Sequence, residues 1–432
     1  MSRRRIFGHT SPTWVRQSGR ALAALALGTL VGLSASEPEI LIGVAAVILL
    51  VFVTASLRRP DPLVFIAFVL LAMPKLHVPG SPLPMGETLM LLAVLSAFLT
   101  LKEGLHPLPR WARLSLGIFV ATLVVSTAVN GLIEYDNFKR LLHVAVYALV
   151  IIGLVRGLLP RKVAMRGLVV GMVISMLSGF ILFPKSSYVG RFTGFFGDPN
   201  VAGLLLVVLG AVALSGIERL RYRVAFLVLL LPALVLAYSR TALLAAIMVF
   251  LWVWVGRKLK PIPAIAVIAM GAVAIGLLPT SLQQFGPFSD RTGSDQLRDR
   301  VSTQEVAVVR QKPILGHGAG TATVMVNYGT TRFYFHNSYL AMMQEGGVIA
   351  LGFVMALLIG TFLALMSLNT TDRQPFLEGA IIGIWVMAIN LGEVLLELSA
   401  AVAIGFALSY VIRARARAAD EADAPPTAAV VA

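Results

Sequence analysis

Apolar runs of about twenty residues recur along nearly the whole chain, and this repetition limits the fold more than any other feature of the sequence. Runs of that length cross the hydrocarbon core of a bilayer as helices, because a helix satisfies its own backbone hydrogen bonds. Hydrophobic residues make up 58% of the 432 residues and charged residues only 13%, which is typical of integral membrane proteins. The sequence therefore predicts an all-α, polytopic membrane protein with about 12–14 transmembrane helices.

The first apolar run, at residues 21–35, follows a basic start and ends in small residues, as a signal peptide does. A second run, Ile40–Leu57, comes almost immediately, so we favour a retained hairpin and keep cleavage as the alternative. Further spans are expected near residues 63–74, 85–101, 112–131, 139–155, 165–183, 200–217, 223–238, 241–256, 262–279, 348–368, 377–392 and 397–412.

The formal net charge of +15 has an explanation in the membrane, and no nucleic-acid partner is needed. Cytoplasmic segments of membrane proteins collect Lys and Arg, and the N-terminus together with alternate loops holds 24 of the 36 basic residues. An even number of spans in the cytoplasmic (inner) membrane, with both termini in the cytoplasm, fits this bias. We expect a basic N-terminus, a first set of spans, a large extracytoplasmic loop, a second set of spans and a disordered cytoplasmic tail, at residues 1–20, 21–279, 280–336, 337–413 and 414–432.

The large loop, residues 280–336, is the one extended polar segment between spans. Polar segments longer than about fifteen residues in compact proteins are usually functional or disordered. The stretch DQLRDRVSTQEVAVVRQK has helical periodicity, so we expect the loop to be ordered and functional.

Several kinds of chemistry are excluded by what the sequence lacks. It has no cysteine, which excludes disulfides, thiolate catalysis and zinc–thiolate sites. It has no D-x-D pair, no His/Glu pair at i, i+4 spacing and no G-x-x-x-x-G-K-[ST] motif. We therefore expect no cofactor, no catalytic metal and no direct use of ATP.

Three polar stretches on the expected outer side are candidates for function. The first, YVGRFTGFFGDPNVAG, holds Arg191, Asp198 and Asn200. GDPN is a turn signal and Asn200 can cap the next helix, so a capped turn explains Asp198 and Asn200 about as well as a site does. Arg191 differs, because a basic residue on an outer face opposes the charge bias.

Arg240 stands in the second stretch, AYSRTALLAA, between two apolar runs. An arginine at membrane depth is usually paired or lines a wet cavity, although a snorkelling residue at a helix end is the plain alternative. Because a guanidinium binds phosphate in a bidentate geometry, Arg240 indicates an anionic ligand.

The third stretch is the large loop with its exit into the next span. It supplies Arg298, Arg300 and Arg310, and then the turn GHGAG, which lacks the flanking residues of a phosphate-binding loop. His317 in that turn is as consistent with a structural role as with an active one.

His336 lies just before a span, in the aromatic segment FYFHN. An imidazole there titrates near neutral pH and can accept a proton from a hydroxyl, whereas a hydrogen-bonded histidine in an aromatic belt is the structural alternative. Glu345 is nine residues further on and about half a turn out of phase, so in one continuous helix it would point away from His336.

Four segments in this order resemble the O-antigen ligase and polymerase family of bacterial cell-envelope glycosyltransferases: GFFGDPNVAG, SRTALLA, R…KPILGHGAG and FHNSYLAMMQEGGVIALG. The resemblance covers the region from Gly190 to Leu368. It implies a metal-independent enzyme that takes a glycan from a polyprenyl-pyrophosphate carrier, and a single in-line displacement by the acceptor hydroxyl would invert the anomeric carbon. The acceptor would be a sugar hydroxyl of a glycan or lipid on the extracytoplasmic face of the membrane.

The resemblance also implies roles for single residues. His336 matches the family's loop histidine and is the expected base. Asn337 is the second residue of that motif. Asn337, Asn200 and Asp198 are expected to be supporting residues of the site. Arg240 matches an arginine that follows a span-end serine, and it is expected to bind pyrophosphate.

Two further pyrophosphate ligands follow from the resemblance. Arg300 matches the family's loop arginine, and Arg191 is a weaker match. The aromatic that the family often places four residues after the loop arginine is Gln304 here, so Arg298 and Arg310 stay as rivals to Arg300.

Two other functions stay open at this point. A carrier or flippase of lipid-linked glycans would have a similar number of spans, and Glu393 and Glu397, at i, i+4 spacing near a span end, are its best support. A peptidoglycan polymerase would lead with an outer acidic residue, for which the candidates are Asp290, Asp295 and Asp299. We find no internal repeat of the kind common in carriers, so a glycosyltransferase is the main hypothesis, with ligation and polymerisation not separable.

Overall fold

Twelve α-helices and one short hairpin form the described part of the chain. The computed structural model describes residues 61–77, 81–100, 106–131, 134–186, 188–260, 263, 292–326 and 331–422, all of which belong to the unit that begins at Arg59. The spans predicted at residues 21–35, at Ile40–Leu57 and, except for position 263, at 262–279 lie outside these ranges.

The first eight helices follow the predicted spans closely. They are α3 (Asp61–Leu71), α4 (Met85–Thr100), α5 (Arg110–Val129), α6 (Tyr135–Arg156), α7 (Arg161–Ile181), α8 (Pro199–Gly216), α9 (Leu220–Leu236) and α10 (Arg240–Val255). Short 3-10 turns, η1 (Phe183–Lys185), η2 (Gly194–Phe196) and η3 (Gly256–Lys258), lie between or after them. The remaining elements are α13 (Thr292–Val309), β1 (Thr323–Val326), β2 (Thr331–Tyr334), α14 (Ser338–Met366), α15 (Pro375–Met387) and α16 (Leu398–Ala422).

Six of the described helices are long and apolar enough to cross a membrane: α5, α6, α7, α8, α14 and α16. The helices α3, α4, α10 and α15 are apolar but shorter. With helices almost throughout, the predicted all-α, polytopic fold class is confirmed. Small residues permit close approach between helices, as at Gly171 of α7, where an added Cβ would meet the Val69 carbonyl oxygen of α3 at 2.3 Å.

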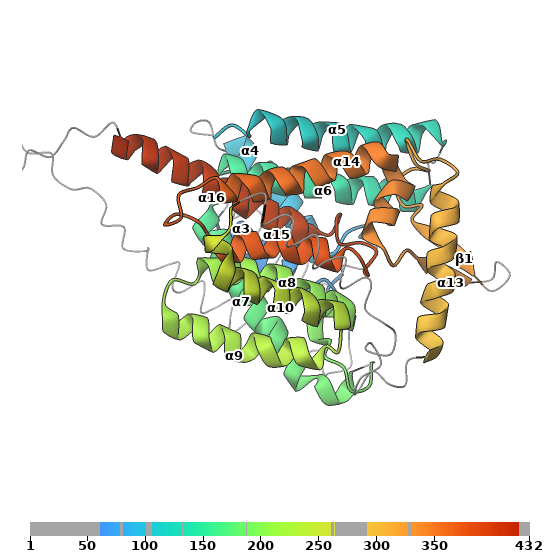
Figure 1. The fold of residues 1–432 in the computed structure, drawn as a ribbon, viewed down its shortest axis with the longest axis horizontal. Helices are drawn as coiled ribbons and strands as arrows, with labels where there is room; N and C mark the ends of the chain where they lie inside the picture. Colours follow the sequence, from blue (N-terminus) through green and yellow to red (C-terminus); the bar gives the residue numbers. More distant parts are fainter. Residues whose placement is uncertain are drawn as a thin grey trace, which may run out of the picture. The chain divides into compact units, whose positions relative to one another are not determined.

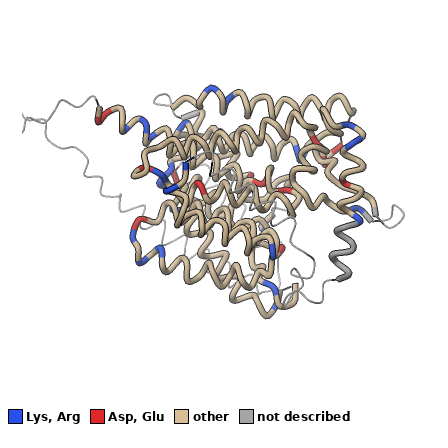
Figure 2. The backbone as a smooth tube through the Cα atoms, viewed as in Figure 1, with Lys and Arg blue, Asp and Glu red and all other residues tan. Residues whose placement is uncertain are grey.

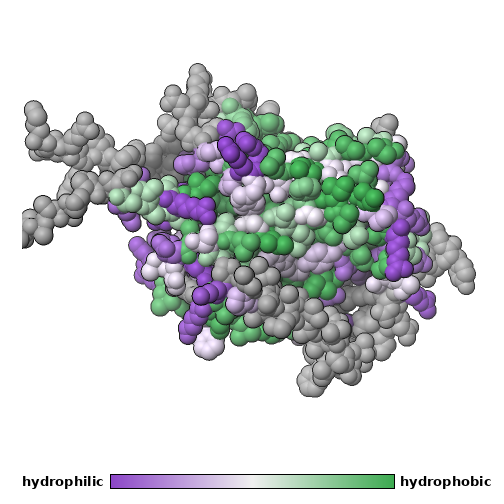
Figure 3. Space-filling view, turned by 45° about the horizontal axis from the view of Figure 1, so that its top comes forward, coloured by the Kyte–Doolittle hydropathy of each residue, from purple (hydrophilic) through white to green (hydrophobic). Residues whose placement is uncertain are grey.

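Polar and apolar residues are distributed along the helices as a bilayer requires. Most helices run side by side in one direction or its reverse (Figure 1), and Lys and Arg lie mostly toward their two ends (Figure 2). Apolar side chains spread over the middle of the face in Figure 3, with hydrophilic ones toward both sides. The helix α13 stands across one end of the others (Figure 1), and we call this end the loop end.

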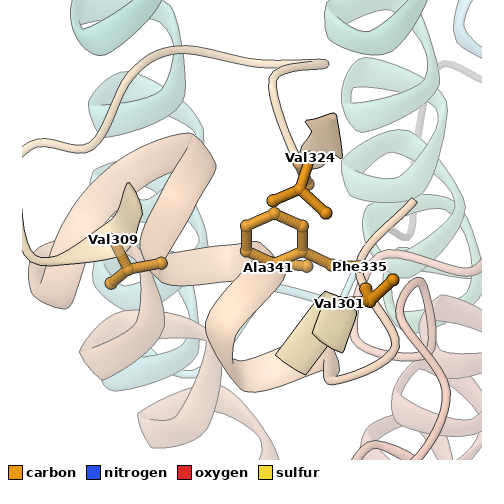
Figure 4. Close-up of a cluster of buried hydrophobic side chains, with 6 residues drawn as sticks. Val301, Val309, Val324, Phe335 and Ala341 are labelled. Atoms are coloured by element: carbon orange, nitrogen blue, oxygen red, sulfur yellow. The ribbon is translucent and has the colours of Figure 1, made fainter. Parts of the chain in front are cut away.

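The hairpin and α13 enclose a small core of their own at the loop end. The strands pair antiparallel, with Thr323 opposite Tyr334 and Val324 opposite Phe333. Figure 4 shows the Phe335 ring among the side chains of the apolar cluster that α13, β1 and α14 contribute: Val301, Val309, Val324 and Ala341. The expectation of an ordered helix within the large loop is therefore confirmed by α13.

Three boundaries differ from the predicted ones. The span expected at 348–368 belongs to α14, which begins at Ser338 and is broken at Gly347 by non-helical dihedrals (φ 68°, ψ −171°). The helix expected at 377–392 ends at Met387. The helix α16 continues to Ala422, so residues 414–422 are helical where a disordered tail was predicted.

Candidate active site

Several helix termini meet at the loop end. The C-terminus of α5 and the N-terminus of α6 contact the loop, because the amides of Asn130 and Asn137 donate to the carbonyls of Gly316 (3.3 Å) and Ala319 (2.7 Å). The helices that follow run back and forth with short connections, so α7 and α9 end, and α8 and α10 begin, at the same end. The segments that hold Arg191, Arg240 and His336 therefore share one end of the helical unit.

The main chain around His336 is fixed on three sides. The His336 amide donates to Glu305 Oε1 of α13 (2.6 Å). The amide before it and the amide two residues after it donate to other segments, Phe335 to Ala322 (3.1 Å) and Ser338 to Ala388 after α15 (2.8 Å). Hydrogen bonds to three separate segments leave this backbone little freedom to move.

A tight packing contact adds to these bonds. A Cβ added to Gly392, in the connection between α15 and α16, would lie 1.7 Å from the Phe335 carbonyl oxygen. The connection therefore lies directly against the peptide before His336, which only a glycine permits.

The imidazole of His336 is held in one tautomer. Its Nδ1 lies 3.0 Å from the Tyr334 carbonyl oxygen. Because a carbonyl oxygen only accepts, this bond requires a proton on Nδ1, so that in the neutral ring the basic lone pair is on Nε2. The residue is half-buried, so the ring combines a fixed backbone with a nitrogen in the form that can accept a proton.

Asn337 is the N-cap of α14. Its side-chain oxygen accepts from the amides of Tyr339 (2.9 Å) and Leu340 (3.1 Å), which satisfies two of the donors that a helix N-terminus leaves unpaired. The cap sets where α14 begins relative to His336, and the supporting role in the site stays a prediction.

Arg191 joins two of the predicted segments. Its Nε donates to the Ala237 carbonyl (3.2 Å), and its Nη2 donates to the Tyr238 carbonyl (3.3 Å) and to Asn200 Oδ1 (3.5 Å). Tyr238 has a positive φ of 46°, and the turn that it makes leads directly into Arg240, the first residue of α10. The structure therefore places Arg191 and Asn200 beside the turn that leads into Arg240.

The first turn of α8 is capped by Asp198. Its Oδ1 accepts from the amides of Asn200 (2.7 Å) and Val201 (3.2 Å). The expectation that Asn200 caps this helix was wrong, because Asn200 is the second residue of α8 and its side chain faces Arg191 instead. A Cβ on Gly203 would lie 2.5 Å from that of Ala242, so the N-termini of α8 and α10 are packed side by side.

The loop arginines occupy different positions on or after α13. Arg300 lies in this helix with an exposed side chain, and Arg310 is exposed just beyond its end. The side chains of Arg298, Asp295 and Asp299, and all of Asp290, lie outside the described residues. Among the side chains described on α13, that of Glu305 bonds to the His336 segment.

The GHGAG turn packs against the break in α14. The amides of His317 and Gly318 donate to the carbonyls of Gln344 (2.6 Å) and Glu345 (3.0 Å), and Gly316 and Gly318 have positive φ. Burial and the charge of Lys312 lower the pKa of the His317 imidazole. This arrangement favours the structural role for His317.

Sequence reasoning missed a buried ionic network next to the loop end. Arg140 of α6 lies 3.1 Å from both carboxylate oxygens of Glu345 and 3.5 Å from Glu393. The expectation that Glu345 does not serve His336 agrees with this pairing. A second pair, one turn along α6, joins His143 Nδ1 to Glu87 Oε2 at 2.7 Å. These ion pairs hold together α4, α6, α14 and the connection between α15 and α16, which contains Glu393.

Lys75 is a further basic residue that the sequence did not single out. It follows α3, its amide donates to the Phe195 carbonyl (3.2 Å), and its stem would lie 3.6 Å from a Cβ on Gly197. Lys75, whose side chain is exposed, therefore lies against the loop between Arg191 and Asp198. The available signal was a lysine at the end of a span that the charge bias predicts to be outside, the same signal that singled out Arg191.

Comparison with known proteins gives one family match, which covers part of this site. Residues 225–355 match the family model described as O-Antigen ligase, a region that includes Arg240, Arg300 and His336. Arg191, Asp198 and Asn200 precede it. No curated protein matches the chain. The resemblance inferred from the sequence is confirmed over residues 225–355, and the chain is a multi-pass membrane protein in which this region is similar to the O-antigen ligase family.

Proposed function

We propose that the protein is a membrane glycosyltransferase that moves a glycan from a polyprenyl-pyrophosphate donor to a sugar hydroxyl. The observation that carries the proposal is the His336 ring, whose bond to the Tyr334 carbonyl leaves the lone pair on Nε2. The ring lies at the end of the helical unit where Arg191 bonds to the turn before Arg240. A base and a pair of guanidinium groups are what this transfer needs.

The reaction follows from these groups. The acceptor hydroxyl passes its proton to His336 Nε2 as its oxygen attacks the anomeric carbon of the donor sugar. The bond from that carbon to the pyrophosphate oxygen breaks, and the carrier leaves with the pyrophosphate. One displacement in line inverts the configuration at the anomeric carbon. The donor is already activated, so positioning and charge stabilisation account for most of the catalysis.

Arg191, Arg240 and Arg300 bind the pyrophosphate in this proposal. Guanidinium groups suit the developing negative charge, and the paired N-termini of α8 and α10 add favourable backbone dipoles. The site faces the extracytoplasmic side of the inner membrane, and both termini lie in the cytoplasm. The bias of basic residues toward the opposite loops supports this orientation.

Substitution in cells that lack the native gene tests the proposal. His336→Ala, Arg240→Ala and Arg300→Ala are each expected to abolish or strongly reduce surface glycan, while the lipid-linked donor accumulates outside. Arg221→Ala is the matched control, because Arg221 is exposed at the opposite end of α9. Protein abundance in the membrane is measured for each variant. Accumulation of the donor on the cytoplasmic side would support a carrier instead, and normal glycan with His336→Ala would refute the assigned base.

A further inference from the structure

Glu305 is an unusual residue for the place that it occupies. It lies on α13 four positions after Val301 and four before Val309, and all three side chains are buried in the apolar cluster of the loop. Its exposed fraction is 0%. Burial raises the pKa of its carboxyl group, the direction expected when an acid leaves water. Such a group is retained in an apolar core only where a specific partner compensates.

That partner is the main chain of the proposed base. Glu305 Oε1 accepts from the His336 amide at 2.6 Å, across 31 residues of sequence. Its Oε2 is buried and makes no hydrogen bond within the described part of the chain. One strong bond to one backbone amide is therefore the contact through which this carboxyl group can act.

The bond joins two parts of the proposed site. The same helix, α13, carries Arg300 five positions before Glu305, with its side chain exposed. The other bonds of the His336 segment lead to Ala322 and Ala388, which lie outside α13. A rigid link between α13 and His336 keeps the base at a constant distance from the helix that holds a phosphate ligand.

We infer that Glu305 is a positioning residue, whose Oε1 fixes the His336 backbone to α13 and thereby sets the imidazole relative to the donor. This inference rests on the proposed function. It assigns the effect to the acceptor atom of Glu305 and not to its charge. It differs from a simple packing role, which any apolar side chain of similar volume would fill.

Three substitutions separate these roles. Glu305→Gln keeps an acceptor oxygen at the same reach and removes the charge. Glu305→Asp keeps the charge but shortens the side chain by one methylene, which moves the acceptor oxygen away from the His336 amide. Glu305→Val fills the apolar cluster and removes the acceptor. Gln304→Ala is the matched control, because Gln304 is the preceding residue of α13 and is exposed.

Two quantities are measured in membranes that contain equal amounts of each variant, after each variant has been shown to be monodisperse when it is solubilised. Turnover is measured as the rate at which undecaprenyl pyrophosphate is released from lipid-linked glycan. Affinity of the donor site is measured as the Kd for undecaprenyl pyrophosphate alone. We expect Glu305→Gln and Gln304→Ala to retain wild-type turnover within about threefold. Glu305→Asp and Glu305→Val should lose about 10- to 100-fold in turnover with unchanged Kd, the scale of a misplaced catalytic group.

The inference is overturned if Glu305→Val turns over like the wild type, or if Glu305→Gln is as impaired as Glu305→Val. It is also overturned if the Kd for undecaprenyl pyrophosphate rises in step with the loss of turnover. If Glu305→Val fails to insert, Glu305→Asp against Glu305→Gln decides the question. His336→Ala is measured alongside, because its full activity would refute the proposed function, whereas an inactive His336→Ala with an active Glu305→Val refutes only the role of Glu305.

Discussion

The two loop histidines occupy opposite kinds of site. At His317 the glycine turn is packed into the break of α14 and the imidazole Nδ1 is buried without a hydrogen-bond partner in the described residues. At His336 the backbone is held by three segments while the ring is bonded through Nδ1 to a carbonyl, which directs Nε2 to accept a proton. A fixed backbone with a basic nitrogen suits catalysis, whereas a ring with an orphaned nitrogen suits the core of a turn.

This difference shows that the hydrogen bonds of its backbone separate a candidate catalytic histidine from a structural one better than its neighbours in sequence do. Both residues lie in the same loop and both are flanked by small or aromatic residues. Only His336 has its amide held by a buried carboxylate, and only His336 lies directly before a capped helix. We therefore expect substitutions at the His336 turn to reduce turnover and substitutions at the His317 turn to reduce stability.

Gly392→Ala is expected to have the largest effect. The added Cβ would lie 1.7 Å from the Phe335 carbonyl oxygen, so the peptide before His336 must move. We expect turnover to fall by about 100-fold or more, since small displacements of catalytic groups are that costly. Gly352→Ala is the control, because its Cβ would meet no atom within 4 Å. Normal turnover with Gly392→Ala would show that the backbone position of His336 does not matter.

Gly316→Ala is expected to affect stability. Gly316 has φ +70°, and a Cβ there would lie 2.7 Å from the Gln344 carbonyl oxygen, so both strain and a clash oppose the change. We expect a loss of about 2 kcal/mol, measured as a lower Tm in detergent. Turnover per folded molecule at low temperature should stay near that of the wild type. A selective loss of turnover with an unchanged Tm would make the His317 turn part of the active site.

Asn337→Ala is expected to have an intermediate effect. It removes the oxygen that accepts from Tyr339 and Leu340, which costs about 1 kcal/mol at a typical N-cap. Asn337→Asp is the matched variant, because aspartate caps helices equally well and its charge suits a helix N-terminus. We expect the Tm to fall for alanine only. Equal loss in both variants would mean that the amide nitrogen of Asn337 has a separate role.

The pH dependence at His317 is the smallest effect. Burial lowers the pKa of His317 in the folded state, so the unfolded chain takes up more protons as the pH falls through the ordinary value of 6.5. The stability contributed by the neutral ring is present above that pH and is lost below it. We expect His317→Gln to reduce the decrease in Tm between pH 7.5 and pH 5.5. An unchanged decrease would show that other groups determine it.

The helices could be predicted because run length and hydropathy are local properties of the sequence. The break in α14 could not, because GG within an apolar stretch is also compatible with a straight helix, and only the inserted GHGAG turn explains it. His336 and Arg240 could be singled out because polar residues are scarce next to apolar runs. The contacts around them could not, since Glu305 bonds to the His336 amide, and Arg191 to the turn before Arg240, across long stretches of sequence.

One signal for Glu305 was available. Valines at 301, 308 and 309 place position 305 on the apolar face of a helix, where a carboxylate is exceptional. Arg140 gave no comparable signal, because its partners Glu345 and Glu393 are distant in sequence.

The central claim is that His336, and not His317, is the base of the transfer. The most direct test is turnover of His336→Ala and His317→Ala in the same membranes, at equal protein abundance and with saturating lipid-linked glycan. We predict that His336→Ala loses at least about 100-fold, the lower range for removal of a general base, while His317→Ala stays within about threefold of the wild type. Equal activity of the two variants, or a greater loss with His317→Ala, would contradict the claim.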